Sequence, residues 1–218
     1  GASLGATFAI MLGFGAVFGG NFVGVMAFIG AMLVSFGVLI LANIKGSANS
    51  SKLILSGMAL SAVCSSFSNF IIYIANDKTG MQSVSYWLLG SLAGAKWETN
   101  IIILPLVIVA CLFFWSRYRT LNLMLLGDEV SITLGTNLHK PRHIYLIITS
   151  MIIGISVYCA GVIGFVGLII PHAVRMIVGT DHKKLIPISV LVGAIFMVLA
   201  DILARIIIPN AEMPIGIL

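Results

Sequence analysis

An all-α bundle of membrane-spanning helices is the fold class that this sequence predicts. The chain is 60% hydrophobic and 9% charged, and its mean hydropathy is +1.14. Soluble domains carry about 25% charged residues, so these values indicate an integral membrane protein. Apolar stretches of about 20 residues recur, which is the length that one helix needs to cross a bilayer. Alternation with period two is absent, which argues against an outer-membrane β-barrel.

Seven segments are apolar enough to be embedded in the membrane. They are residues 1–18, 22–42, 53–75, 98–116, 143–161, 165–178 and 186–207. The sixth is short for a complete crossing, so we expect it to lie partly behind other helices. The sequence has no initiator Met, and it stops just after an EMPIGI segment that opens another element. We therefore expect an internal portion of a longer polytopic protein.

Basic residues indicate how the segments are oriented. If the segments alternate in direction, nine of the twelve Lys and Arg residues lie on one side of the membrane. These nine are Lys45, Lys52, Arg117, Arg119, Lys140, Arg142, Arg175, Lys183 and Lys184, whereas Lys78, Lys96 and Arg205 lie on the other. The positive-inside rule makes the first side cytoplasmic. No Lys/Arg cluster alternates with aromatic residues, so we predict no nucleic-acid partner.

The third segment carries a stripe of small and polar residues. Gly57, Ser61, Ser65 and Asn69 recur every four residues and therefore share one helix face. Two readings are open. The stripe packs against another helix while its serines bond to carbonyls four residues back, or it forms the wall of a water-accessible path or subunit seam. Elsewhere, glycines spaced four apart, such as Gly1/Gly5, predict helices that approach closely.

The outer connection after the third segment, residues 75–98, contains SYWLLGSLAGAKW. Tyr86, Trp87 and Trp97 are typical of the aromatic belt at headgroup level. We expect either a short interfacial helix or an anchored connecting loop.

The longest polar connection, residues 117–142, lies on the predicted cytoplasmic side. Asp128 and Glu129 precede a short apolar-patterned turn, and Gly135 is typical of a helix end. The turn contains Val130, Ile132 and Leu134, which have no lipid to contact. This pattern predicts a short helix that docks on another protein. The alternative is a solvated loop that folds back on its own bundle.

Residues with catalytic or metal-binding potential do not form a convincing site. GASLG matches the GxSxG elbow with Ser3 as nucleophile, but that motif requires a strand-to-helix turn. An intramembrane serine hydrolase would pair Ser3 with His172. His139 and His143 are four residues apart, but Pro141 between them argues against a continuous helical metal site. We predict no catalytic residue and no metal.

Several stretches together carry a family resemblance. GFVGLIIPHAVR begins at residue 164, GTDHKKLIP at 179, GAIFMVLADILAR at 193 and EMPIGI at 212; LLGDEVSITLGTN and GASLGA precede them. In this order, over essentially the whole chain, they resemble the FecCD-type permeases of bacterial ABC importers. Those permeases carry ferric siderophores, haem or cobalamin across the inner membrane.

The resemblance implies a fold and a set of partners. It implies the fold of a type II ABC importer permease, with about seven of an expected ten transmembrane helices here. Residues 1–218 would form a single permease domain, with a cytoplasmic coupling element at about 120–142. Partners would be a second permease subunit, identical or paralogous, two ATP-binding subunits and an extracytoplasmic substrate-binding protein. No GxxxxGK[ST] motif occurs, so ATP-Mg would be used by the partner, and we expect no cofactor on this chain.

The resemblance also implies roles for particular residues. The ATPase-coupling residues would be Asp128, Glu129, Val130, Ile132, Leu134 and Gly135, and the translocation path would include Gly57, Ser61, Ser65 and Asn69. Arg205 would dock the binding protein, or else reach the interface as a snorkelling residue. For Gly164, Gly167, Pro171, His172 and Arg175 we expect a structural role: Pro171 at an early helical position, His172 bonding an exposed carbonyl, and Arg175 reaching the cytoplasmic interface.

Asp201 needs a partner inside the membrane, and Arg205 lies four residues later on the same face. The leading hypothesis is alternating-access import of an iron chelate, driven by ATP. The first alternative is a secondary transporter, which needs an essential acidic residue at mid-membrane, and only Asp201 qualifies.

Overall fold

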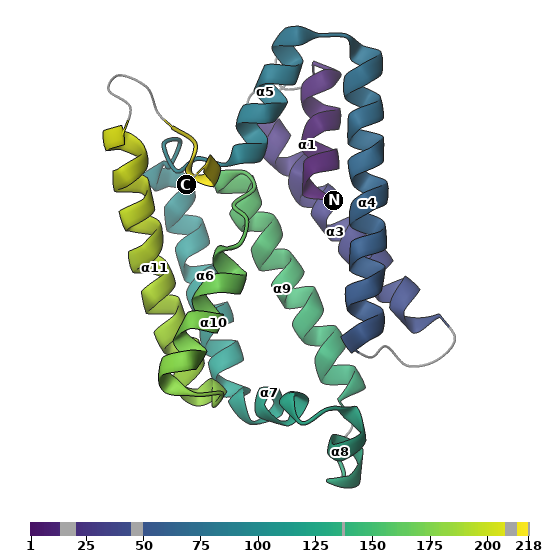
Figure 1. The fold of residues 1–218 in the computed structure, drawn as a ribbon, viewed down its shortest axis with the longest axis vertical. Helices are drawn as coiled ribbons and strands as arrows, with labels where there is room; N and C mark the ends of the chain where they lie inside the picture. The colour runs from purple at the N-terminus through teal and green to yellow at the C-terminus, as the bar shows by residue number, and fades with distance from the viewer. Residues whose placement is uncertain (14–20, 45–49, 137, 208–212, 218) are drawn as a thin grey trace. The chain divides into compact units, whose positions relative to one another are not determined.

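The structure is a computed structural model that describes residues 1–13, 21–44, 50–136, 138–207 and 213–217. For Asn21, Ser50, Asp128, Glu129 and His139 the description covers the backbone but not the side chain. The helices are α1 (Ala2–Met11), α3 (Asn21–Asn43), α4 (Ser50–Ala75), α5 (Lys78–Leu89), α6 (Trp97–Ser116), α7 (Tyr118–Leu125), α8 (Asp128–Thr133), α9 (His139–Ala160), α10 (Val166–Val178) and α11 (His182–Ile207), followed by the 3₁₀ helix η1 (Ile215–Ile217) (Figure 1).

The predicted helical fold class is confirmed. Among the described residues, five helices are long and apolar enough to cross a membrane, namely α3, α4, α6, α9 and α11. α1 and α10 are shorter apolar helices, so each of the seven predicted segments contains a helix. The 13 residues of α10 extend about 20 Å, which is less than the hydrocarbon thickness of about 30 Å. The sixth segment is therefore too short to cross the bilayer alone, as predicted.

The chain divides into two compact units. Unit 1 contains Gly1–Gly94 and Arg142–Val162, and unit 2 contains Ala95–Pro141 and Ile163–Leu218. A single permease domain over residues 1–218 stays a prediction.

Close packing of α1 on α3 forms the centre of unit 1. Ala6 and Ala9 of α1 and Ala27 of α3 are at most 1% exposed. A Cβ added at Gly30 would lie 2.6 Å from the carbonyl oxygen of Gly1, closer than any side chain tolerates. Residues without a side chain allow this approach. The close helix packing predicted from the small-residue spacing is confirmed here.

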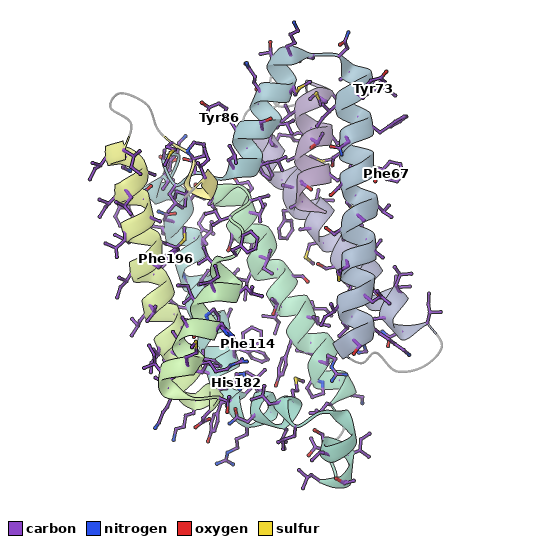
Figure 2. All side chains as sticks on the ribbon, viewed as in Figure 1. Phe67, Tyr73, Tyr86, Phe114, His182 and Phe196 are labelled. Carbon is purple, nitrogen blue, oxygen red and sulfur yellow. The ribbon has the colours of Figure 1, made fainter. Side chains whose placement is uncertain are left out.

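The connection after α4 is the short helix α5. The Asp77 carboxylate caps it by accepting hydrogen bonds from the backbone N–H groups of Thr79 and Gly80, each at 3.0 Å. The alternative of a connecting loop is therefore wrong for Lys78–Leu89. Tyr86 is 66% exposed and points outward (Figure 2). Trp87 differs from the predicted belt, because it packs against the core of unit 1.

In unit 2, α10 packs against α11. Ile170 and Val174 of α10 and Leu185 of α11 form the buried cluster. At the end of α6, the Trp115 Nε1–H donates a hydrogen bond of 3.0 Å to the carbonyl oxygen of Lys183, at the beginning of α11. α7 contacts α11, and Figure 1 shows it lying crosswise to the long helices of this unit. The end of α6 and the beginning of α11 thus lie close to α7, on the predicted cytoplasmic side.

Candidate functional site

The connection between α6 and α9 consists of two short helices rather than a loop. α7 ends at Leu125, Gly127 adopts a positive φ of 90°, and α8 follows at once. At the end of α8, the N–H of Gly135 donates to the carbonyl of Ile132 and the N–H of Thr136 donates to the carbonyl of Ser131, both at 2.9 Å. With a φ of 76° at Gly135, this is a Schellman motif. The predicted short helix, ended by Gly135, is confirmed.

Ser131 fixes α8 on α7. Its side chain is 0% exposed. Its Oγ donates towards two carbonyl oxygens, that of Gly127 at 2.7 Å and that of Leu123 in α7 at 3.1 Å. A buried hydroxyl is stabilising only when it is bonded, so these bonds favour the observed arrangement of α8 on α7. The sequence analysis missed Ser131, whose signal was a small polar residue among apolar neighbours.

The apolar side chains of α8 face outward. Val130 is 45% exposed, Ile132 63% and Leu134 58%. Nothing lies within 4 Å of a Cβ built on Gly135. This exposure does not support the alternative of a loop folded back on its own bundle. Asp128 and Glu129 are also predicted coupling residues, but their side chains lie outside the described part of the structure.

A polar junction joins α7 to the beginning of α11. The Asn122 Oδ1 accepts hydrogen bonds from the His182 backbone N–H at 2.9 Å and the His182 Nδ1 at 2.7 Å. The Asn122 Nδ2 donates to Asp181 Oδ1 at 2.8 Å. Asp181 Oδ1 also accepts from the Lys183 N–H at 3.1 Å, which caps α11. The sequence analysis did not identify this junction, although an Asp before a basic helix start was a visible signal.

The Asp181 carboxylate is stabilised in its charged form. The hydrogen bond from Asn122 is the main cause that lowers the pKa of Asp181, and the bond from the Lys183 N–H and the charges of Lys183 and Lys184 add to it. Beside the junction lies an open groove of about 570 Å³. It is lined by Arg119, Asn122, Leu123, Leu125, Leu126, Thr180 and Asp181.

The small-residue stripe of α4 lies on the open surface of unit 1. Ser61, Ser65 and Asn69 are exposed, and nothing lies within 4 Å of a Cβ built on Gly57. Of the nearby serines, Ser66 bonds to the carbonyl four residues back, at 3.0 Å. The stripe is therefore not packed against another helix of unit 1. Tyr73, which continues the stripe four residues after Asn69, and Phe67, on another face of α4, point away from the unit as well (Figure 2).

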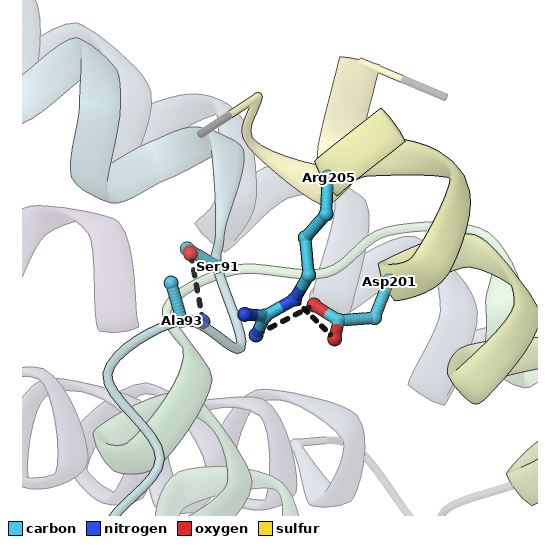
Figure 3. Close-up of polar contacts among 4 residues, drawn as sticks. All are labelled: Ser91, Ala93, Asp201 and Arg205. Carbon is cyan, nitrogen blue, oxygen red and sulfur yellow. Dashed lines mark hydrogen bonds and ion pairs between the residues drawn. The ribbon is translucent and has the colours of Figure 1, made fainter. Parts of the chain in front are cut away.

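The predicted pairing of Asp201 with Arg205 is confirmed. The Arg205 Nε donates to Asp201 Oδ2 at 2.8 Å and its Nη2 lies 3.5 Å from Oδ1 (Figure 3). The Arg205 side chain remains 51% exposed and the Asp201 side chain 24%. Arg205 thus presents part of its guanidinium while its charge is balanced.

The Gly164–Arg175 motif forms the beginning and body of α10. Gly164 precedes the helix and Gly167 lies in its first turn. Pro171 lies in the second turn, not at the expected early position, because α10 already begins at Val166. His172 is exposed and makes no hydrogen bond among the described residues, so the expected bond to a carbonyl is not seen. Arg175 lies in the last turn, where a cation complements the helix dipole.

The residues considered for other chemistry are accounted for by helices. Ser3 lies in the first turn of α1, so GASLG is no strand-to-helix elbow. α9 begins at His139 and continues through Pro141. The N–H that proline lacks would have no partner within the helix at this position in the first turn, so no hydrogen bond is lost. Pro141 therefore does not interrupt the helix, contrary to expectation. His143 Nε2 lies 3.2 Å from the amide nitrogen of Asn43 in α3, and the side chain of His139 lies outside the description.

Comparison with known proteins gives the family. The sequence profile of the FecCD transport family matches residues 1–218. The chain belongs to this family. The hemin transport system permease protein HmuU of Yersinia pestis is 38% identical over 192 residues, which cover 88% of this FecCD chain. The cobalamin import system permease protein BtuC of Halobacterium salinarum is 37% identical over 218 residues, which cover 100% of it.

A solved structure is similar as well. It is described as an inward-facing conformation of a metal-chelate type ABC transporter, with a TM-score of 0.85 and 31% identity, over 100% of this FecCD chain and 68% of the solved one. The chain spans 57% of the length of each of the two named relatives. Its family and its membrane-spanning helices make it part of a multi-pass membrane protein of the transport class.

Proposed function

We propose that this FecCD chain is the transmembrane permease subunit of an ATP-driven ABC importer in a bacterial inner membrane. The cargo is a metal chelate, in the first instance an iron chelate of the ferric siderophore kind, with haem or cobalamin as the other members of this substrate class. The relatives named for hemin and cobalamin transport support this class. The partners are a second permease subunit, two ATP-binding subunits and an extracytoplasmic binding protein.

The observation that carries the proposal is the exposure of the apolar side chains of α8 and its C-cap. Val130, Ile132 and Leu134 are exposed on a short helix whose end is fixed by a Schellman motif. These apolar side chains are exposed on the predicted cytoplasmic side, where there is no lipid to contact. A protein partner that docks here would bury them. Asp128, Glu129 and Gly135 complete this coupling element. ATP-Mg is bound by the partner, and we propose no cofactor on this chain.

The α4 stripe is the proposed wall of the translocation path. A polar side chain on a membrane-spanning helix is costly against lipid, so Ser61, Ser65 and Asn69 need water or protein in front of them. Small residues around Gly57 leave room for a large chelate and offer it few strong contacts. A wall that bound the chelate tightly would retain it.

Arg205 is the proposed contact for an acidic side chain of the binding protein. Its guanidinium is partly exposed, and Asp201 keeps the residue in place. The same pairing weakens the case for a secondary transporter, because a carboxylate held by a guanidinium is poorly suited to take up and release a coupling ion. A hydrolase is disfavoured by the helical setting of Ser3.

Alternating access is the mechanism that we propose for these parts. Nucleotide-driven closure of the ATP-binding subunits displaces α8, and the helices around the path tilt to open it towards the other side. Gly164, Gly167, Pro171, His172 and Arg175 have a structural role in this scheme.

The proposal is tested by reconstituting the full-length permease with its ATP-binding subunits and binding protein in proteoliposomes. We expect uptake of a ferric siderophore that collapses with a hydrolysis-dead ATP-binding subunit and persists with Asp201→Asn. Uptake that persists with the dead subunit and is lost with Asp201→Asn would overturn the proposal in favour of ion coupling. Competition by haem or cobalamin would distinguish the members of the substrate class.

A further inference from the structure

α7 lies between the docking helix α8 and the long membrane helix α11, and side-chain hydrogen bonds join it to each of them. Ser131 of α8 donates to the carbonyl of Leu123 in α7. The next residue back, Asn122, bonds to Asp181 and His182 at the start of α11. The two sets of bonds are therefore separated by one peptide unit of α7.

We propose that Ser131 and Asn122 are positioning residues that join α8, α7 and the beginning of α11 into one lever. A displacement of α8 by the ATP-binding partner is then passed to α11 instead of being absorbed by the connection. This inference rests on the proposed function, because it assumes that α8 is the docking helix.

The bond at Ser131 removes the freedom of the α7–α8 turn. Gly127, with no side chain and a φ of 90°, would otherwise allow the two helices to hinge. The fully buried Ser131 Oγ spans this glycine, bonding to its carbonyl and to the carbonyl of Leu123 on the far side. A hinge motion at Gly127 would break the bond from Ser131 to the Leu123 carbonyl, whereas the bond to the Gly127 carbonyl moves with α8.

The bonds at Asn122 remove the corresponding freedom between α7 and α11. One amide side chain makes three hydrogen bonds of 2.7–2.9 Å, to the backbone and side chain of His182 and to Asp181. Asp181 in turn caps α11 through the Lys183 N–H. The bond from Trp115 to the Lys183 carbonyl ties the end of α6 to the same point. α11 then continues for 26 residues as one helix.

The first test measures transport per ATP hydrolysed by the reconstituted full-length transporter with ferric siderophore. We expect Asn122→Leu and Ser131→Ala each to lower this ratio about fivefold while ATP hydrolysis continues, since a lost hydrogen bond of this kind shifts an equilibrium by roughly 2- to 13-fold. Ser150→Ala is the matched control for Ser131, because its Oγ bonds within α9 to the carbonyl of Leu146 at 2.7 Å.

Rescue separates a specific bond from general damage. Asn122→Asp alone places two carboxylates opposite each other and is expected to uncouple. Combined with Asp181→Asn, it restores a donor–acceptor pair with the roles exchanged, and the new carboxylate still accepts from His182. We expect the double variant to recover most of the lost transport per ATP. Unchanged coupling in Asn122→Leu and Ser131→Ala, or a double variant no better than Asn122→Asp, would overturn the proposal.

A distance measurement tests the lever independently of transport. Spin labels at Thr133 of α8 and Ile195 of α11, in the full complex, are expected to give one narrow distance that is the same with and without ATP. Asn122→Leu is expected to broaden it. A wild-type distance that changes with ATP would refute the lever. If the complex transports no chelate but keeps the narrow distance, the proposed function fails and the mechanical linkage stands.

Discussion

Replacing Gly30 with alanine tests the packing that forms the centre of unit 1. The added Cβ would lie 2.6 Å from the carbonyl oxygen of Gly1 and 3.3 Å from the Cα of Gly5. Both are backbone atoms, so no side chain can rotate away and α1 must move from α3. Real Cβ contacts stay beyond 3.0 Å, so the helices must separate by at least 0.4 Å, the difference between 3.0 and 2.6 Å.

The energy follows from two opposing effects. Overpacking of a well-packed core costs about 1–3 kcal/mol. The better helix propensity of alanine returns at most about 1 kcal/mol. With the full propensity gain, we expect Gly30→Ala to lower the free energy of unfolding by about 0–2 kcal/mol, and by about 1–3 kcal/mol relative to a glycine-to-alanine change that meets no contact.

The assay is unfolding of the full-length permease in detergent micelles by increasing fractions of a denaturing detergent, followed by tryptophan fluorescence. Gly57→Ala is the matched control, since it makes the same change in α4 where nothing lies within 4 Å of the new Cβ. It is expected to be neutral or stabilising by up to about 1 kcal/mol. Equal stability of the two variants would refute the reasoning that backbone contact at Gly30 requires glycine.

Three further predictions concern the site. Ile132→Ser, which removes an exposed apolar side chain of α8, is expected to weaken binding of the ATP-binding subunit at least about tenfold in a pull-down titration, since burying Ile contributes about 1.5–3 kcal/mol; unchanged binding would contradict docking at α8. Ser65→Phe is expected to block uptake while the melting temperature stays within a few degrees, and Val63→Phe, at a position 49% exposed on the opposite face of the same helix, serves as its control; wild-type uptake by Ser65→Phe would remove α4 from the path. Asp181 has a lowered pKa when folded, so its contribution to stability is present above its ordinary pKa of 3.8 and declines as pH falls through the lowered value. The difference in melting temperature between wild type and Asp181→Asn is therefore expected to shrink below pH 3.8, and a difference that grows there would contradict the assignment.

Helix positions were predictable because they depend on local properties. The segment predicted at 98–116 is the helix Trp97–Ser116, and that predicted at 22–42 is Asn21–Asn43. The length of an apolar stretch and the residues that end a helix can both be read from consecutive positions in the sequence. Other boundaries differ more. α1 ends at Met11 instead of residue 18, and α11 begins at His182 instead of residue 186. α9 begins at His139 instead of residue 143, because Pro141 fits a first helical turn.

The polar junction could not be predicted in the same way. Asn122 and Asp181 are 59 residues apart, and neither the period of a helix nor a motif relates them. Trp87 shows the same limit on a smaller scale. Tryptophan is typical of the membrane–water interface, but the position of Trp87 on α5 directs its side chain towards the core of unit 1.

The amino-acid sequence alone determined that this is a polytopic helical membrane protein of the FecCD type, that a short helix interrupts its longest polar connection, and that Gly135 ends that helix. These properties follow from hydrophobicity and backbone conformation, which act between neighbours in the chain. Only the tertiary structure decided that Ser131 and Asn122 bond across helix ends and that the α4 stripe stays uncovered by its own unit. Hydrogen bonds need donor and acceptor within about 3 Å in a defined direction, and it is the packing of whole helices that brings such groups together.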